Sequence, residues 1–442
     1  MTSQQLTILF MPESAYGPTN QCIGLGNELL KRGHRVVFAA EASWKGKLTG
    51  FGFEEDLVHL APPAVDAGEG DQDAGQFWKD FIRDTSPEFR KPTIDQLETF
   101  IKPTWQALID GAMYCEPQLR EIIARVKPDV IVEDNVLTFP ALLTSPAPFV
   151  RIVSCNPLEM KGTGVAPTFS GLPFDDQSQW DVFKKRYDET HREMWESFNA
   201  WVMSQGAPAL PDLEFIHTSE HANMYVYPQE IDYTEQRPLN STWHRMDSSV
   251  RETDGEFEMP ESMKNRPEGS ALIYLSLGSL GSADVDLMRR LISILGKTHH
   301  RFIVSKGPQH STYEVAENMY GAEFLPQIKI IPQVDLVITH GGNNTITESL
   351  HFGKPMIVLP LFWDQYDNAQ RVDETGFGVR LATYEFTDEE IVNAIDDLIN
   401  NQKLQDLLKE TKARIQGNSG IKVGADVIEN VARAYREGSH AH

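Results

Sequence analysis

Cysteine is scarce in this chain, and its scarcity argues against two kinds of structure. The 442 residues include three cysteines, Cys22, Cys115 and Cys155, and no two of them form a C-x-x-C pair. Disulfide frameworks and zinc sites need cysteines, or cysteines with histidines, at short and regular spacings. We therefore expect neither a disulfide framework nor a zinc site, and three unpaired thiols are typical of a reducing compartment.

Basic charge and long apolar runs are also lacking. The 40 lysine and arginine residues face 64 aspartate and glutamate residues, which gives a formal net charge of −24. Nucleic-acid backbones and anionic membranes both need basic surface, so we expect neither as a main partner. No window of about 18 apolar residues occurs, and the first residues do not read as a signal peptide. We therefore expect a soluble, cytoplasmic protein.

The sequence does contain two series of short apolar runs that alternate with helical patterns. The first series opens with a strand-like run at residues 6–11, a helical pattern at 22–30 and another run at 36–40. The second begins with runs at residues 271–277 and 301–305. Such alternation is typical of doubly wound parallel sheets. We predict an α/β fold with two Rossmann-like domains that face a central cleft, where ligands bind beyond the carboxyl ends of the strands.

Changes in composition give the expected domain boundaries. A polar, proline-containing segment precedes the second series and is typical of a linker. We expect an N-terminal domain over residues 1–240, a linker over 241–268, a C-terminal domain over 269–415, and a C-terminal helix in 416–442 that can pack back on the N-terminal domain. Residues 160–222 are rich in aromatic side chains, which either fill the core or line an apolar pocket.

The most informative stretch reads DLVITHGGNNTITE and ends at Glu348. A buried strand delivers His340 to a glycine-rich turn, and a helix begins near Asn344 or Thr345. The free N–H groups and positive dipole end of such a helix bind anions, and a small residue such as Gly342 lets a diphosphate approach the backbone. Glu348 could accept hydrogen bonds from a ribose diol. Alternatively, Thr345 and Glu348 form a capping box that only holds the helix start.

Two further stretches place polar groups where ligands could meet them. Asp364 and Gln365 set a carboxylate beside a carboxamide, a pair that can hold neighbouring hydroxyl groups of a sugar. Alternatively, this segment is a turn in which Asn368 caps the next helix. Phe324 and Gln327 offer an aromatic face and an amide that suit a nucleobase, although a buried phenylalanine in a loop would look the same.

These three stretches, in this order, resemble the donor-binding signature of the inverting UDP-glycosyltransferases of the two-domain GT-B type. That family includes plant secondary-metabolite transferases, animal UDP-glucuronosyltransferases and bacterial macrolide glycosyltransferases. The resemblance spans nearly the whole chain, because G-P-T-N at 17–20 and R-G-H at 32–34 match as well. It implies a GT-B fold and transfer of a sugar from a UDP-sugar to a small apolar acceptor, with inversion and without a metal ion or other cofactor.

The resemblance also implies a role for each matched residue. Phe324 would stack on uracil, with Gln327 near the base and ribose. Glu348 would hold the ribose hydroxyl groups, and Asp364 and Gln365 would hold the sugar. The diphosphate would be bound by Ser279, His340, Asn344 and Thr345, with Gly342 as the glycine of close approach.

One departure from the family falls at the expected general base. The family's first loop carries Gly-His-x-Asn, and this chain has Pro18 where the histidine is expected. The aspartate that orients the family's histidine matches Asp134. In one hypothesis Asp134 accepts the proton, directly or through a water, with its pKa raised by an apolar cleft. Glu13 and Glu133 are weaker candidates, because surface carboxylates are the simpler interpretation of both.

Two other hypotheses need no general base. Acceptors such as phenols, thiols or carboxylates could be acidic enough for positioning and leaving-group stabilisation to suffice. Alternatively, the chain binds UDP or a lipophile with weak or no transfer. We expect the enzyme, with glucose as the sugar, because no basic residue adjoins Asp364 and Gln365 to favour a glucuronate. A lipophilic acceptor would make detoxification the expected role.

Two other classes of enzyme fit less well. A metal-dependent transferase would need an Asp-x-Asp motif after a strand, and the two such motifs, at 71–73 and 284–286, do not follow strand ends. A Rossmann oxidoreductase would need a glycine fingerprint between a strand and a helix, but Gly24 and Gly26 lie inside a predicted helix. We therefore expect neither.

Overall fold

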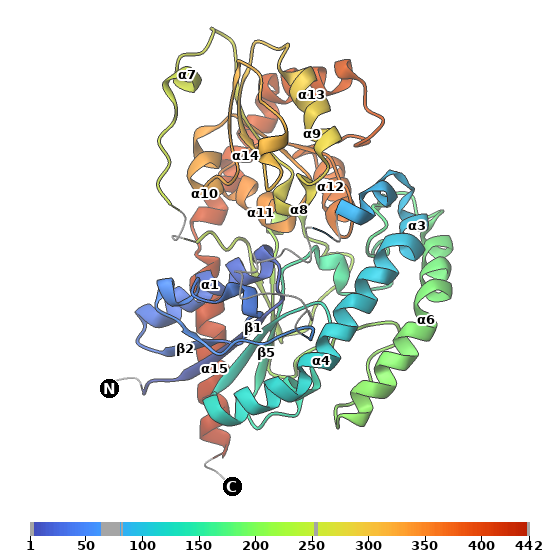
Figure 1. Cartoon of the computed structure of the whole chain (residues 1–442), viewed down its shortest axis with the longest axis vertical. Helices are drawn as coiled ribbons and strands as arrows, with labels where there is room; N and C mark the ends of the chain where they lie inside the picture. The colour runs from blue at the N-terminus through green and yellow to red at the C-terminus, as the bar shows by residue number, and fades with distance from the viewer. Residues whose placement is uncertain (1–3, 63–79, 81–82, 252–254, 440–442) are drawn as a thin grey trace.

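Two parallel sheets form the framework of the protein (Figure 1). The computed structural model describes residues 4–62, 80, 83–251 and 255–439. Every strand pair within these residues is parallel, which confirms the predicted α/β class. The Asp-x-Asp motif at 71–73 lies outside the described residues.

The first sheet has seven strands in the order β3-β2-β1-β4-β5-β6-β7. They are β1 (Thr7–Pro12), β2 (Arg35–Phe38), β3 (Glu54–Glu55), β4 (Val130–Asp134), β5 (Phe149–Val153), β6 (Ala222–Val226) and β7 (Trp243–Met246). The central strands are buried along almost their whole length, as in sheets covered on both faces. Pro12 and Asp134 are register partners, so β1 and β4 end at the same point. The sheet continues beyond residue 240, because β7 is its edge strand.

Long helices cover the first sheet. They are α1 (Tyr16–Lys31), α4 (Lys102–Val126), α6 (Trp180–Ser204) and α15 (Gly420–Ser439). Helix α1 ends where the sequence predicted, with Gly33 just past it in the left-handed region at φ 87°. Helix α15 returns from the far end of the chain and packs against α1 and β7 (Figure 1). An ion pair of 2.6 Å between Arg436 and Asp129 joins α15 to the start of β4.

The second sheet has six strands in the order β10-β9-β8-β11-β12-β13. They are β8 (Leu272–Ser276), β9 (Arg301–Ser305), β10 (Met319–Ala322), β11 (Leu336–Thr339), β12 (Met356–Val358) and β13 (Gly378–Arg380). The helices of eight or more residues around it are α9 (Val285–Leu295), α11 (Asn343–His351), α12 (Gln365–Glu374), α13 (Asp388–Asn400) and α14 (Gln402–Gln416). The strands are Val-, Ile- and Leu-rich and buried, so the residues that bear chemistry are left to the strand ends.

Short helices fill the connections. They are α3 (Thr93–Gln96), α5 (Pro140–Leu143), α7 (Glu261–Lys264), α8 (Gly278–Gly281) and α10 (Gln327–Ile330). Helix α1 of the first half and helices α8 and α11 of the second half lie where the two halves meet (Figure 1). Within the described residues, no helix is long and apolar enough to span a bilayer.

Candidate active site

The turn after β11 carries His340 and lies beside the end of β8. Thr339 and Ser276 are register partners, so the two strands end side by side. Gly278 opens α8 with a φ of 72°, and a Cβ placed on it would lie 2.8 Å from the imidazole of His340. Glycine at this position therefore leaves room for the imidazole over the β8–α8 turn, which also carries Ser279.

The His340 imidazole is uncharged at neutral pH. Burial lowers the pKa of His340 to about 4, because the imidazolium form would be poorly solvated, and a hydrogen bond with the Ser276 backbone opposes the shift. A neutral imidazole has one N–H donor and one acceptor nitrogen. His340 can therefore hold an anion through a hydrogen bond but not through a positive charge.

The N-terminus of α11 lies directly after this turn. The helix begins at Asn343, slightly earlier than predicted, and its N-cap Gly342 makes no side-chain hydrogen bond to the helix. A Cβ on Gly342 would lie 2.7 Å from Nε2 of His340, so only glycine lets the imidazole approach the helix start this closely. The first N–H groups of α11 and its dipole are thus available to an anion beside His340.

Three of the predicted donor-binding residues lie together further along α11. Nε2 of Gln327 donates to Oε2 of Glu348 at 2.5 Å and to Oγ1 of Thr345 at 3.2 Å. Nη1 of Arg251, from the segment between the two sheets, lies 3.5 Å from Oε1 of Glu348. The alternative prediction of a capping box at Thr345 and Glu348 is wrong, because the N-cap of α11 is Gly342 and the carboxyl group of Glu348 contacts Gln327 and Arg251. Sequence reasoning missed Arg251, which had no signal beyond its place in a polar segment.

Phe324 presents its ring to solvent. It lies in the loop between β10 and α10 and is 54% exposed, so the alternative of a buried phenylalanine is wrong. It directly precedes the segment that carries Gln327. An exposed aromatic ring at this place offers a free face on which a base could stack.

Asn344 faces the opposite domain. Its Nδ2 donates to the carbonyl of Gly17 at 3.3 Å, and its Oδ1 accepts from Nε2 of Gln21 at 2.5 Å. Both partners lie in the first turns of α1, next to Pro18. The first loop of the N-terminal half therefore meets the His340 turn, as two domains facing one cleft require.

Asp364 and Gln365 lie at the same domain interface, and both are already hydrogen bonded. Oδ2 of Asp364 accepts from the backbone N–H of Asn156 at 2.8 Å. Burial raises the pKa of Asp364 to about 7; the Asn156 hydrogen bond opposes this shift. Oε1 of Gln365 accepts from the backbone N–H groups of Leu361 and Phe362, at 3.0 and 3.2 Å. The side-chain carbonyl of Gln365 thus holds the backbone of the preceding loop. Its side-chain NH₂ group is the part that could reach a sugar.

A polar cluster around Asn156 closes the interface behind Asp364. Nδ2 of Asn156 donates to Oδ1 of Asn368 at 2.8 Å and to the hydroxyl groups of Tyr227 and Tyr233 at 3.0 and 3.2 Å. The predicted helix cap at Asn368 is wrong, because α12 begins at Gln365 and Asn368 lies inside it. Nothing in the sequence singled out Asn156, since the partners of its side chain come from distant segments.

An apolar cavity of about 190 Å³ lies between the ends of β1, β4 and β5, helix α4 and the loop before α12. The apolar side chains on its wall are those of Ala15, Pro18, Phe100, Leu108, Val136, Leu280, Phe362 and Trp363. No residue of 160–222 lines it, and several aromatic residues of that segment, such as Phe198, fill the core instead. Leu280 of α8 and Trp363, the residue before Asp364, bound the cavity on one side, and Pro18 bounds it on the other. The cavity therefore adjoins the β8–α8 turn and the loop that leads to Asp364.

Trp363, on the wall of this cavity, has a strained backbone conformation. Its φ of 57° lies in the left-handed region, which is rare for a bulky residue. The ring is fixed by Phe169 and Trp105, whose ring centroids lie 4.5 and 5.2 Å away. Strained residues of this kind persist only where the surrounding packing holds them, and they cluster at functional sites.

Three carboxyl groups also line the cavity. Glu13 follows β1, Asp134 ends β4, and Glu159 follows β5, where it pairs with Arg151 at 2.7 Å. Both carboxyl oxygens of Asp134 lie 2.5 Å from the hydroxyl group of Ser154, which donates to them. Burial raises the pKa of Asp134 well above its ordinary value, and the charges of Glu159 and Glu13 raise it further. Pro18 and Asp134 therefore face the same cavity, as the position of the missing histidine predicts.

The described residues hold no group of three or more histidine, cysteine, aspartate or glutamate side chains placed to bind a metal ion. Asp284 instead caps α9, because its Oδ1 accepts from the N–H of Leu287 at 3.2 Å. Its other oxygen accepts from the hydroxyl group of Tyr384 at 2.8 Å. Asp284 of the Asp-x-Asp motif at 284–286 thus serves as a helix cap and as a hydrogen-bond partner of Tyr384.

Comparison with known proteins shows which family this chain resembles. The family model described as UDP-glucoronosyl and UDP-glucosyl transferase matches residues 212–410. The oleandomycin glycosyltransferase of Streptomyces antibioticus is 25% identical over 94% of this chain and 88% of its own. The NDP-glycosyltransferase YjiC of Bacillus subtilis (strain 168) is 23% identical over 97% of both chains. These matches confirm the resemblance of the chain to the UDP-glycosyltransferase family.

The fold agrees with this assignment. The crystal structure of the kitacinnamycin glycotransferase superposes with a TM-score of 0.70 over 97% of this chain and 100% of its own, at 20% sequence identity. The predicted GT-B fold is therefore confirmed. The family model and these relatives support a glycosyltransferase of this type, an enzyme that transfers a sugar from a nucleotide-sugar donor.

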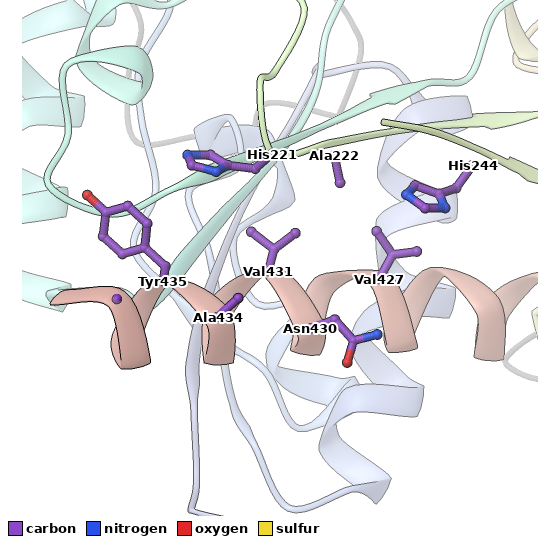
Figure 2. A pocket seen from close by; sticks show the side chains of 9 residues that line it. His221, Ala222, His244, Val427, Asn430, Val431, Ala434 and Tyr435 are labelled. Carbon is purple, nitrogen blue, oxygen red and sulfur yellow. The ribbon is translucent and has the colours of Figure 1, made fainter. Parts of the chain in front are cut away.

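A larger cavity lies elsewhere in the described part of the chain. A groove of about 650 Å³ runs between α15 and the ends of β6 and β7, with His221 and His244 on one side and Val427 and Val431 on the other (Figure 2). None of the predicted donor-binding residues lines it. The groove lies against the C-terminal helix and away from the junction of the two domains. The size of a cavity alone therefore does not locate the active site.

Proposed function

We propose that the protein transfers a hexose, with glucose as the expected sugar, from a UDP-sugar to a small lipophilic acceptor, with inversion and without a metal ion. The observation that carries this proposal is the apolar cavity that touches Pro18 of one domain and Leu280 and Trp363 of the other. An acceptor bound there would lie beside the loops of His340 and Asp364. A role in the detoxification of lipophilic compounds follows from the same apolar wall.

The donor would lie along α11. The free N–H groups at its start and the neutral imidazole of His340 would bind the diphosphate, with Gly342 allowing close approach. Ser279, Asn344 and Thr345 would add hydroxyl and amide donors. The ribose would replace Gln327 as the partner of Glu348, since both residues are hydrogen bonded to each other in this structure.

The base and sugar would occupy the two ends of this groove. The exposed ring of Phe324 is free to stack on uracil. Asp364 and the NH₂ group of Gln365 would hold hydroxyl groups of the sugar. Because Asp364 accepts from the Asn156 backbone across the interface, a bound sugar would share this carboxylate with the N-terminal domain.

Sugar transfer would proceed in one displacement step. The acceptor oxygen attacks the anomeric carbon from the side opposite to the diphosphate, so an α-linked donor gives a β-glycoside. The N–H groups of α11 and His340 stabilise the negative charge that grows on the leaving UDP. A carboxyl group on the cavity takes the place of the family's histidine, and Asp134, which matches the aspartate that orients this histidine, is one candidate.

The cavity also narrows the class of acceptor. The carboxyl groups of Glu13 and Glu159 on its wall would disfavour an anion, so carboxylate acceptors fit poorly. Neutral phenols, thiols and alcohols with aromatic or alicyclic bodies fit the rings of Phe100, Phe362 and Trp363. Of these, phenols and thiols need the least help in losing their proton.

A protein of the same fold that binds UDP or a lipophile with weak or no transfer is the second candidate, which Pro18 favours. A screen by mass spectrometry separates the two. UDP-glucose, UDP-glucuronate and dTDP-glucose are each incubated with a panel of phenols, thiols and alcohols, with and without a chelator. We expect glucosides from UDP-glucose in both conditions. Binding of UDP without any glycoside across the panel would favour the second candidate.

A further inference from the structure

Two carboxyl groups stand side by side where the family has a single histidine. Pro12 and Asp134 are register partners at the ends of β1 and β4, and the N–H of Glu13 donates to the carbonyl of Asp134 at 2.7 Å. Glu13 opens the short loop before α1, whose first turn carries Pro18, and the side chains of Glu13, Pro18 and Asp134 line the same cavity. Glu13 therefore reaches the acceptor cavity from the segment directly before the position of the missing base.

The two carboxyl groups differ in how open they are to an acceptor. Asp134 is 2% exposed, and both of its carboxyl oxygens are covered by the hydroxyl group of Ser154. Glu13 is only half-buried. Its Oε2 accepts from the N–H of Ala15 and its Oε1 from the hydroxyl group of Ser14, each at 3.0 Å. Each oxygen of Glu13 thus has one local donor, which fixes the side chain and leaves further acceptor capacity toward the cavity.

The two groups also differ in how readily they ionise. Burial raises the pKa of Asp134 well above its ordinary value; the hydrogen bond from Ser154 opposes this shift, and the charges of Glu159 and Glu13 add to it. Burial also raises the pKa of Glu13, but hydrogen bonds from Ala15 and Ser14 oppose that shift. Adjacent carboxyl groups do not both ionise readily, and Asp134 is the more deeply buried of the two, so Glu13 is the one that ionises first.

We propose, on the basis of the function proposed above, that Glu13 is the general base of the transfer reaction and that the backbone carbonyl of Asp134, which accepts from the N–H of Glu13, positions it. The O–H bond of the acceptor breaks, and its proton passes to a carboxylate oxygen of Glu13. The electron pair that the O–H bond leaves on the acceptor oxygen forms the new bond to the anomeric carbon. The bond between this carbon and the diphosphate oxygen breaks, and UDP leaves with the electron pair. No further reactant is needed.

The direct test compares Glu13→Gln with Asp134→Asn, using an aliphatic alcohol and an acidic phenol as acceptors. For Glu13→Gln we expect kcat with the alcohol to fall by about 10²–10⁴-fold, which is the usual value of a general base, and kcat with the phenol to fall by less than about tenfold. For Asp134→Asn we expect a loss of less than about tenfold with both acceptors, because a neutral side chain replaces a neutral one.

The matched control is Glu133→Gln. Glu133 precedes Asp134 on β4, is fully buried and does not line the cavity. Burial raises the pKa of Glu133 to about 8, so at pH 7 the substitution replaces a mostly neutral carboxyl group by a neutral amide. We expect its kinetics with both acceptors to match the wild type at pH 7.

The pH profile of kcat/KM for the alcohol gives an independent readout. The profile should rise with pH as Glu13 loses its proton, and this rise should be absent in Glu13→Gln and present in Asp134→Asn. The other titratable groups facing this cavity are Glu159, which is paired with Arg151, and the thiol of Cys155. The pKa of Cys155 is raised well above its ordinary value, so its ionisation falls outside this limb.

Chemical rescue guards against loss of fold. Formate should restore alcohol transfer to Glu13→Ala and not to Asp134→Ala, because only the first site lies open to the cavity. The assignment of Glu13 would be overturned if Glu13→Gln kept the wild-type rate with the alcohol and the rise of kcat/KM with pH, and if Asp134→Asn lost both. In that case wild-type transfer and UDP binding would still support the proposed function. If the wild type neither bound UDP nor transferred sugar, both proposals would fall.

Discussion

A single methyl group at Gly342 should weaken UDP binding without unfolding the protein. Its Cβ would lie 2.7 Å from Nε2 and 2.8 Å from Cε1 of His340, closer than real Cβ contacts allow. The φ of Gly342 is −59° and its ψ 136°, which any residue adopts, so Gly342→Ala adds no backbone strain. The imidazole must therefore swing away from the start of α11, and the diphosphate loses one hydrogen bond and some of its close approach.

The expected loss follows from the strength of that hydrogen bond. A hydrogen bond to a charged group is worth about 1.5–3 kcal/mol, which corresponds to a rise of about 10- to 100-fold in the Kd for UDP. Isothermal titration calorimetry measures this Kd directly. The thermal unfolding midpoint should change little, because the clash is relieved by one half-buried side chain.

Gly376→Ala is the matched control. Gly376 has a φ of 80° and no atom within 4 Å of an added Cβ, so this substitution adds strain without a clash. It should lower the free energy of unfolding by about 1–2 kcal/mol and leave the Kd for UDP unchanged. A folded Gly342→Ala protein that bound UDP as tightly as the wild type would refute the placement of the diphosphate beside His340.

The remaining predictions concern the sugar, pH and metal ions. Asp364→Ala should raise the KM for UDP-glucose and leave the Kd for UDP within about threefold, because Asp364 would touch only the sugar; equal losses for both ligands would count against that role. Burial raises the pKa of Glu133 to about 8, so its carboxyl group costs stability as pH rises from about 4.5 through 8. Glu133→Gln should therefore show a smaller fall in unfolding midpoint than the wild type between pH 5 and pH 9, and parallel curves would contradict this burial effect. A chelator should leave initial rates of transfer unchanged, and restoration of a lost rate by a divalent cation would disprove metal independence.

The parts of the site that depend on strand ends could be predicted from the sequence. A Val/Ile-rich run followed by His340 and two glycines fixes a strand, a turn and a helix start, because those elements follow local rules. The same rules located the end of α1 at Gly33. They did not exclude the capping box at Glu348, since the pattern alone cannot show that the helix starts at Asn343, before the residue that would have to be its cap.

Contacts across the domain interface could not be predicted from the sequence. Asn156 bonds to Asn368, and its N–H bonds to Asp364, although these residues lie more than 200 positions apart in the chain. Arg251 reaches Glu348 from the segment between the sheets. Such pairings are set by how two independently folded surfaces meet, and no local pattern encodes them. For the same reason the sequence favoured a surface carboxylate at Glu13, since its place on the cavity wall depends on how distant segments pack.

Titration of UDP into the wild-type protein and into His340→Ala, both in the presence of a chelator, tests the central claim most directly. The account predicts one UDP bound per wild-type chain without any metal ion, and binding at least tenfold weaker in the variant. Failure of the wild type to bind UDP, or equal affinity in the two proteins, would contradict it.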